Sequence, residues 1–257
     1  MRTVICHYHI FKNSGTSFDE QLTANYGDAH CIFDGPFRYS KINQDELIKI
    51  VSNHKDCIAF SSHQINLPVP SSIDVRVEPV VFVRHPLLRI RSIYQFSKKS
   101  PATSFVGEFS SGLDFGDWIN ECIKSKAGLT MISNAQTRLL SNVYNRPSIQ
   151  RRSASGGLIC DFNQAVRNLS QVNLLGRTEF FELDVSKFTK IMAEFGVEFE
   201  FHRKSASNVT SGDLELPVEA RLERMQREVG EPVYALLKAM NQQDLNLYDF
   251  VTETLQY

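Results

Sequence analysis

Hydrophobic and polar positions along the chain follow two alternating patterns. Continuous apolar runs rich in β-branched residues are typical of buried parallel strands. Such runs occupy residues 3–9, 56–61, 77–83 and 172–176. Apolar residues at helical spacing lie between these runs, over residues 16–24, 45–52, 87–97 and 115–124. Strands that alternate with helices predict an α/β fold with a mainly parallel central sheet, flanked by helices and joined by right-handed crossovers.

The C-terminal part of the chain is expected to be mostly helical. Helical patterns cover residues 185–195 and 218–247, and the charged residues of the second segment predict a solvated helix face. Two stretches rich in serine or glycine, residues 97–116 and 146–157, are long enough to form functional loops. Because the sheet needs strands on both sides of these stretches, the sequence predicts a single domain over residues 1–257.

The segment after the first predicted strand has the composition of an anion-binding turn. Lys12 comes first, and the small or hydroxyl-bearing residues that follow it are Asn13, Ser14, Gly15, Thr16 and Ser17. The first amide groups of a helix have no intrahelical partner and carry partial positive charge, so this turn predicts a phosphate site. A nucleoside-triphosphatase loop would instead place the lysine after its second glycine. A turn that only caps the helix is the alternative interpretation.

A second candidate site follows the apolar run at residues 80–83. Arg84 comes at the expected carboxyl end of a central strand, the edge where open α/β sheets bind ligands. Pro86 suits the first turn of a helix, and Ser92 lies nearly two turns further on. Because the planar guanidinium matches phosphate oxygens, Arg84 and Ser92 are candidates for a second phosphate. The alternative for Arg84 is an ordinary salt bridge at the sheet edge.

These two segments together resemble the sulfotransferases that use 3'-phosphoadenosine 5'-phosphosulfate (PAPS), in particular the branch that sulfates carbohydrates of the heparan and chondroitin type. The loop that holds the 5'-phosphosulfate in that family, H-x-x-K-[ST]-G-[GS]-T-[ST], is matched by His9, Lys12, Gly15, Thr16 and Ser17. The motif that holds the 3'-phosphate, R-[DNH]-P-x-x-R-x-x-S-x-Y, is matched by Arg84, His85, Pro86, Arg89, Ser92 and Tyr94. The chain departs from the family at Asn13 and Ser14, where a hydroxyl residue and a glycine are usual. Weaker similarities occur at residues 58–63, 134–140, 174–179 and 246–248.

The resemblance implies a P-loop-like sulfotransferase fold and sulfuryl transfer from PAPS to a hydroxyl acceptor, most simply a carbohydrate. Lys12 is expected to stabilise the leaving phosphate, while the turn from Asn13 to Ser17 holds the 5'-phosphosulfate. Arg84 and Ser92 are expected to hold the 3'-phosphate, with Arg203 and Lys204 as further cofactor-binding candidates. The transfer is an in-line displacement in which fixed cations neutralise charge, so no metal is expected.

A general base must take the proton of the acceptor hydroxyl. His63 is the first candidate for that base, because it follows a buried strand and is expected to emerge at the same sheet edge as Lys12. His9 is the second candidate, and a histidine that merely packs at a strand end is the structural alternative for His63. Asn134 and Arg138, spaced four residues apart on a predicted helix, are candidates for acceptor binding together with His63.

Composition excludes several other classes of protein. The net charge of −1, from 28 basic and 29 acidic residues, argues against a nucleic-acid-binding protein. The five cysteines have no C-x-x-C spacing, so neither a disulfide framework nor a zinc site is expected. Without a secretory signal or a membrane-length apolar run, the chain is expected to be cytoplasmic and bacterial. A P-loop-like kinase and an inactive nucleotide-binding relative are the alternative functions.

Overall fold

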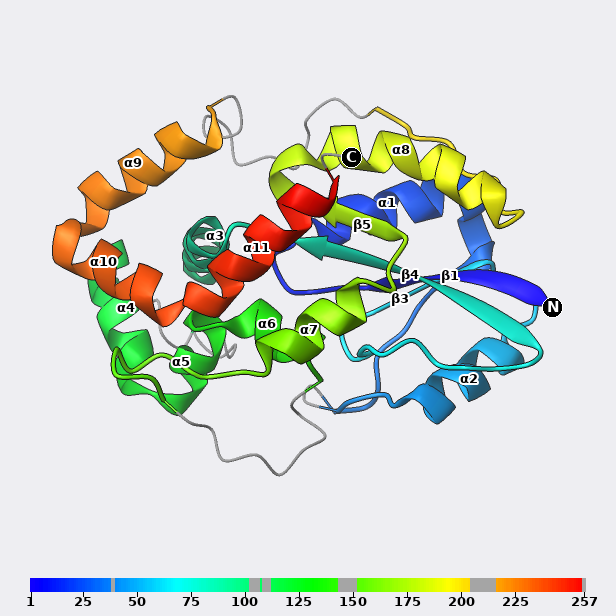
Figure 1. Cartoon of the computed structure of the whole chain (residues 1–257), viewed down its shortest axis with the longest axis horizontal. Coiled ribbons are helices and arrows are strands. Elements are labelled where there is room, and N and C mark those ends of the chain that lie inside the picture. The colour runs from blue at the N-terminus through cyan, green and yellow to red at the C-terminus, as the bar shows by residue number, and fades with distance from the viewer. Residues whose placement is uncertain (38–39, 102–106, 108–111, 143–151, 204–215, 256–257) are drawn as a thin grey trace.

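Five parallel strands form the centre of the molecule (Figure 1). The computed structural model describes residues 1–37, 40–101, 107, 112–142, 152–203 and 216–255. The strands are β1 (Arg2–Tyr8), β2 (His30–Ile32), β3 (Ala59–Ser62), β4 (Val75–Val83) and β5 (Leu174–Arg177). Their order in the sheet is β2-β3-β1-β4-β5. The predicted α/β class and parallel sheet are therefore confirmed.

Strand β1 lies between β3 and β4, and this position determines where the candidate residues emerge. Tyr8 lies opposite Ser62 of β3, and His7 lies opposite Val80 of β4. Because all three strands run in the same direction, the residues that follow them meet at one edge of the sheet. Lys12, His63 and Arg84 follow β1, β3 and β4 respectively, so the topology brings them to the same edge.

Helices cover both faces of the sheet. Side chains alternate along β1, with Val4, Cys6 and Tyr8 on one face and Ile5 on the other. The first face packs against α2 (Gln44–Asn53), α7 (Phe162–Leu169) and α11 (Gln242–Leu255). The second packs against α1 (Gly15–Tyr26) and α8 (Phe181–Glu194). Both sides of the sheet are thus buried, which explains why its strands are continuously apolar.

A helical layer lies beside the sheet, on the left of Figure 1. Buried aromatic and aliphatic side chains around Trp118 form its core. Its helices are α3 (Pro86–Lys99), α4 (Phe115–Lys124), α5 (Lys126–Ile132), α9 (Val218–Val229) and α10 (Glu231–Met240). The short helix α6 (Ala135–Leu140) connects this layer to the sheet. The predicted helical segment 218–247 is divided into three helices, because the chain turns at Gly230, with φ of 78°, and again at Asn241.

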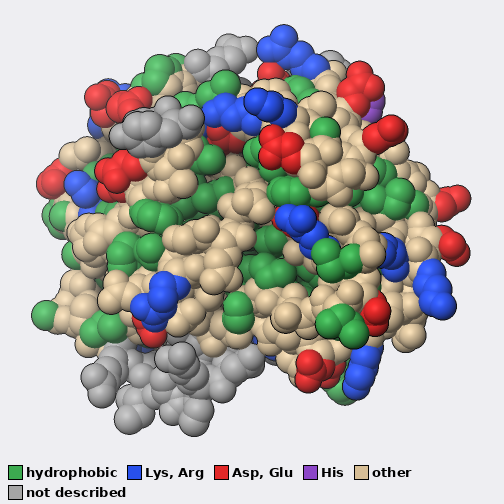
Figure 2. Space-filling view, turned by 45° about the vertical axis from the view of Figure 1, so that its right-hand side comes forward, with side chains coloured by type: hydrophobic (Ala, Val, Ile, Leu, Met, Phe, Trp, Pro, Cys, Tyr) green, Lys and Arg blue, Asp and Glu red, His purple; other side chains and the backbone are tan. Residues whose placement is uncertain are grey.

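The exterior agrees with the nearly balanced charge of the sequence. On the face in Figure 2, acidic and basic side chains are interspersed, and hydrophobic side chains are visible between them. Within the parts of the chain that the structure describes, no helix has the length and hydrophobicity needed to cross a bilayer.

Candidate functional site

The turn after β1 is held in an uncommon backbone conformation by a buried asparagine. Lys12 and Ser14 have φ values of 66° and 59°, in the left-handed region. Asn13 lies between them, and its side-chain Nδ2 donates to the Phe82 carbonyl at 2.8 Å and to Gln136 Oε1 at 2.7 Å. The Asn13 side chain therefore lies beneath the turn and supports it. That Asn13 also contacts the cofactor stays a prediction.

Helix α1 begins directly at Gly15, with its first amide groups turned toward a cleft. No side chain caps this helix, so the capping interpretation of the hydroxyls does not hold for the described residues. A Cβ atom at Gly15 would lie 1.7 Å from Nε2 of His9, so only glycine lets the histidine ring pack against the start of α1. Ser14, Thr16 and Ser17 line the cleft, as a phosphate cradle requires.

Arg84 meets the Lys12 turn at the same rim of the sheet. Its Nη1 donates to the Lys12 carbonyl at 2.9 Å, and its Nε lies 3.5 Å from Oε1 of the buried Glu179. The Lys12 ammonium lies 4.7 Å from the centroid of the Phe96 ring. Burial, and then the neighbouring Arg84 charge, lowers the pKa of Lys12. Two cationic side chains that line the same hollow favour binding of an anion there.

We call the surrounding hollow, with a volume of about 870 Å³, the basic cleft. Among the residues that the structure describes, its cationic lining residues are Lys12, Arg84, Arg91, Arg221 and Arg224. Ser92 of α3 also lines it, as the sequence predicts, and Glu179 and Glu182 are its carboxylates. The prediction of a solvated face on the helix after residue 218 is wrong for Arg221, which is only 9% exposed. Helical periodicity in a sequence shows which residues lie on the same side of a helix, but it does not show which neighbouring element packs against that side.

The remaining cofactor-binding candidates have different outcomes. Arg203 is 80% exposed and forms an ion pair of 2.9 Å with Glu182 at the margin of the basic cleft. It does not itself line the cleft. Lys204 lies outside the described residues.

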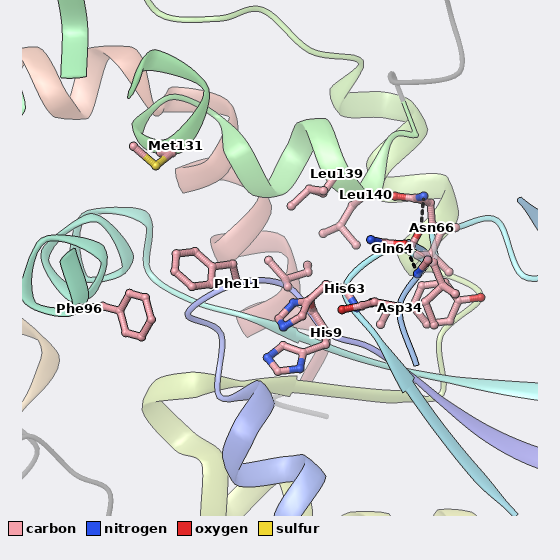
Figure 3. A pocket seen from close by; sticks show the side chains of 15 residues that line it. His9, Phe11, Asp34, His63, Gln64, Asn66, Phe96, Met131, Leu139 and Leu140 are labelled. Carbon is pink, nitrogen blue, oxygen red and sulfur yellow. Dashed lines mark hydrogen bonds between the residues drawn. The ribbon is translucent and has the colours of Figure 1, made fainter. Parts of the chain in front are cut away.

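His63, the candidate base, follows β3 directly and lies beside His9. Its Nδ1 is 2.9 Å from the His9 carbonyl, which can only accept, so Nδ1 carries the proton and donates it. The other ring nitrogen, Nε2, then has a free lone pair. Burial, and next the charge of His9, lowers the pKa of His63, which keeps the ring neutral near pH 7. The His63 ring lies against the His9 ring with centroids 3.8 Å apart (Figure 3).

Asp19 of α1 is a site residue that the sequence analysis missed. Its carboxylate oxygens accept from Nδ1 of His7 at 2.7 Å and from Nδ1 of His9 at 3.1 Å. Burial acts to raise the pKa of Asp19, but the hydrogen bonds from both histidines hold it well below its usual range. Burial lowers the pKa of His7 to about 4. The ligand atoms of His7, His9 and Asp19 lie close enough together to hold a metal ion. The hydrogen bonds from the two histidines to Asp19 are sufficient to explain this arrangement. Asp19 lies four residues, or about one helical turn, after Gly15, and this spacing is the local sequence feature that could have placed it near the site.

The two candidates for acceptor binding are Asn134, directly before α6, and Arg138 within it. Asn134 is 5% exposed, and its Oδ1 accepts from the amides of Gln243 and Asp244, each at 3.1 Å. Arg138 donates to the Thr130 carbonyl at 2.6 Å. Neither side chain lines the basic cleft or the neighbouring cavity. That Asn134 and Arg138 contact the acceptor stays a prediction, and their side chains make contacts inside the protein.

A second hollow, which we call the apolar cavity, adjoins the basic cleft. It has a volume of about 500 Å³. The two hollows share four lining residues, His9, Phe11, His63 and Phe96. His63 therefore lies at the junction between the basic cleft and the mainly hydrophobic apolar cavity, where its side chain can contact a molecule in either hollow.

The left-handed conformation of Ser14 leads to a prediction about stability. Glycine adopts this conformation without the steric cost that a Cβ atom brings, so Ser14→Gly should raise the free energy of unfolding by about 0.5–1 kcal/mol. Ser17→Gly is the matched control within α1, where glycine should lower it by roughly 0.5 kcal/mol. Urea unfolding followed by circular dichroism measures both. Equal changes of the same sign in the two variants would contradict the strained turn.

Comparisons with known proteins identify one relative of nearly the same length. No family model matches the chain. The chain is 26% identical over 256 residues to a protein of Archaeoglobus fulgidus that is described as an uncharacterized protein. The alignment covers 98% of this chain and 97% of the archaeal protein. The similarity thus extends over the complete described fold.

Proposed function

We propose that the protein is a sulfotransferase that moves the sulfuryl group of PAPS to a hydroxyl acceptor. The observation that carries this proposal is the contact between the two predicted phosphate-binding turns. Arg84 Nη1 donates to the Lys12 carbonyl at 2.9 Å, and both side chains line one cleft of about 870 Å³. A cleft of that size suits a nucleotide with phosphates at both ends of its ribose.

The proposed donor fits the distribution of charge in the basic cleft. The 5'-phosphosulfate would lie at Lys12 and the first residues of α1, where Ser14, Thr16 and Ser17 line the cleft. The 3'-phosphate would lie near Arg84 and Ser92, with Arg221 and Arg224 as further cations that the sequence did not indicate.

The transfer step follows from the positions of Lys12 and His63. The acceptor hydroxyl gives its proton to Nε2 of His63 while its oxygen attacks sulfur. The bond between sulfur and the bridging oxygen breaks, and its electron pair stays on the 5'-phosphate of the adenosine 3',5'-bisphosphate product. The Lys12 ammonium and the α1 amides stabilise the negative charge that develops on that oxygen. Asp19 fixes the His9 ring, and the His9 carbonyl fixes the tautomer of His63.

The end of β4 favours this chemistry over a kinase mechanism. P-loop kinases hold magnesium with an acidic residue after a sheet strand, whereas Arg84 follows β4 directly. A cytoplasmic location remains part of the proposal. Its support is that all five cysteines are free thiols, as is usual in a reducing compartment.

Binding of the product tests the donor directly. We expect adenosine 3',5'-bisphosphate to bind saturably without magnesium in isothermal titration calorimetry, because the basic cleft supplies fixed cations for both phosphates. ATP with magnesium should bind far more weakly. Tighter binding of ATP with magnesium would replace the proposal with a kinase, and binding of the bisphosphate without sulfate transfer to any acceptor class would indicate an inactive relative.

Substitutions should separate chemistry from donor binding. Lys12→Ala should lower kcat by roughly 10²–10³, since it removes charge stabilisation at the leaving oxygen. Arg84→Ala should weaken bisphosphate binding by about tenfold or more, since a charged hydrogen-bonding group is lost. Lys124→Ala and Arg167→Ala, on exposed parts of α4 and α7, are the matched controls and should retain wild-type values. Near-normal turnover of the Lys12 variant would remove it from the chemistry.

The pH dependence of transfer should identify the base. Neutral His63 accepts the proton, so kcat/KM should rise with pH through the His63 pKa and then level off. Burial lowers that pKa from its ordinary value of 6.5, so the rise should lie below pH 6.5. His63→Gln should lower kcat/KM by about 10²–10⁴ and abolish this limb, whereas His54→Gln, an exposed histidine, should preserve it. An unchanged limb in the His63 variant would assign the base to another group.

A further inference from the structure

We infer that the acceptor is a small uncharged molecule with an apolar body and one reactive hydroxyl, such as a phenol or an aliphatic alcohol. This inference rests on the proposed sulfotransferase function and names its acceptor class. It departs from the saccharide that the sequence resemblance implies. The argument depends on the apolar cavity next to the basic cleft.

The cavity has the size and surface of a site for a compact hydrophobic ligand. Its volume of about 500 Å³ lies in the range of small-molecule pockets, which are lined mainly by hydrophobic and aromatic side chains. Figure 3 shows Phe11 and Phe96 on one side of this space, with Leu139 and Leu140 across from the histidines. The hydrophobic lining residues are Tyr8, Ile10, Phe11, Ile65, Leu67, Phe96, Met131, Leu139 and Leu140.

The charges around the cavity disfavour an anionic sugar. None of its fifteen described lining residues is a lysine or an arginine, and Asp34 is the single carboxylate among them. Oδ1 of Asp34 accepts from the His63 backbone amide at 3.0 Å and from Ser62 Oγ at 2.7 Å, so this oxygen is already engaged in hydrogen bonds within the protein. A uronate or sulfated sugar would bring negative charge beside Asp34, and the cation near that carboxylate, Lys41, is not among the lining residues of the cavity.

The polar groups of the lining also disfavour a neutral sugar. The Gln64 amide donates to the Phe37 carbonyl at 2.9 Å, and its oxygen accepts from the Gly35 amide at 2.6 Å. Asn66 Nδ2 donates to the Gln64 carbonyl at 3.0 Å. A saccharide buries several hydroxyls, and each hydroxyl left without a partner costs free energy. These amides are engaged inside the protein, and the Tyr8 hydroxyl is a lining group without a hydrogen-bond partner among the described residues. The cavity thus suits a ligand with one or few hydroxyls.

The junction of the two hollows sets the orientation of the acceptor. His63 and His9 line both spaces, so a hydroxyl at the junction reaches the free Nε2 of His63 and faces the basic cleft. The apolar body then points away, toward Leu67 and Leu140, which are 1% and 3% exposed. The Phe11 and Phe96 rings, in edge contact with centroids 5.4 Å apart, offer aromatic surface near the junction.

The test compares acceptors at a fixed PAPS concentration, with transfer of radioactive sulfate as the readout. The acceptors are 2-naphthol, 1-octanol, N-acetylglucosamine and an unsulfated chondroitin tetrasaccharide. We expect kcat/KM to be at least about tenfold higher for 2-naphthol or 1-octanol than for either sugar, since only the apolar compounds can fill the cavity. A higher kcat/KM for either sugar would overturn the inference.

A variant of the cavity wall gives an independent readout. Leu139→Lys places a charge in the apolar lining and should lower kcat/KM for the apolar acceptors by roughly tenfold or more. Adenosine 3',5'-bisphosphate should bind this variant with unchanged affinity, which also shows that the variant is folded. Leu216→Lys, at an exposed leucine that lines neither hollow, is the matched control and should behave like the wild type.

The two proposals fail in distinguishable ways. If the bisphosphate does not bind the wild-type protein, the sulfotransferase function is wrong and the acceptor class falls with it. If the bisphosphate binds but sulfate goes preferentially to sugars, or if Leu139→Lys leaves transfer to 2-naphthol unchanged, the function stands and the acceptor class is wrong. Binding of the bisphosphate without transfer to any of the four compounds also overturns the acceptor class.

Discussion

The hydrogen bonds of Gln136 are the interaction on which the geometry of the site depends. Its Oε1 accepts from the Asn13 amide at 2.7 Å and from the Arg84 backbone amide at 2.8 Å, while its Nε2 donates to the Arg84 carbonyl at 2.8 Å. One side-chain amide thus joins the turn after β1 to the turn after β4. Asn13 and Gln136 are each 1% exposed, so any broken bond would leave a buried polar group without a partner. Asp244 of α11 in turn accepts from the Gln136 and Thr137 amides and holds α6 in place.

This network explains how the chain maintains an arrangement that is locally unfavourable. Lys12 and Ser14 occupy the left-handed region without being glycine, and such residues persist only where the surrounding structure fixes them. The Lys12 ammonium and the Arg84 guanidinium also repel each other at the partly desolvated rim of the sheet, which contributes to the lowered pKa of Lys12. The free energy of the fold therefore holds two cations and a helix N-terminus without a side-chain cap in place. Such preorganisation reduces the reorganisation that accompanies binding and charge development.

The sequence predicts the scaffold of the site better than the contacts within it. Periodicity locates β1, β4, α1 and α3, because buried strands and amphipathic helices impose local patterns, and the parallel sheet then brings Lys12, His63 and Arg84 to one edge. The three-residue β2 was missed because it is too short for a period to be recognised. Gln136 acts through Asn13 and Arg84, which are far away in the chain, and no local pattern encodes a contact of that kind. For the same reason, the i, i+4 spacing of Asn134 and Arg138 indicated a shared helix face but not that the face is turned away from both hollows.

The contacts that link Asp19, His9 and His63 show which groups orient the two rings and whether a proton can pass between them. Asp19 accepts from Nδ1 of His9, but His63 is linked to His9 through the His9 backbone carbonyl and through a tilted contact between the two rings. Proton relay from His63 to Asp19 through hydrogen bonds is therefore interrupted, because a backbone carbonyl offers no proton to pass on. The carboxylate instead fixes the His9 ring against Gly15, and the carbonyl fixes the tautomer of His63. In the proposed mechanism, a proton taken by His63 Nε2 would thus remain on that ring until solvent removes it. Because burial lowers the His63 pKa, this release is favourable at neutral pH, and the neutral base is regenerated between turnovers.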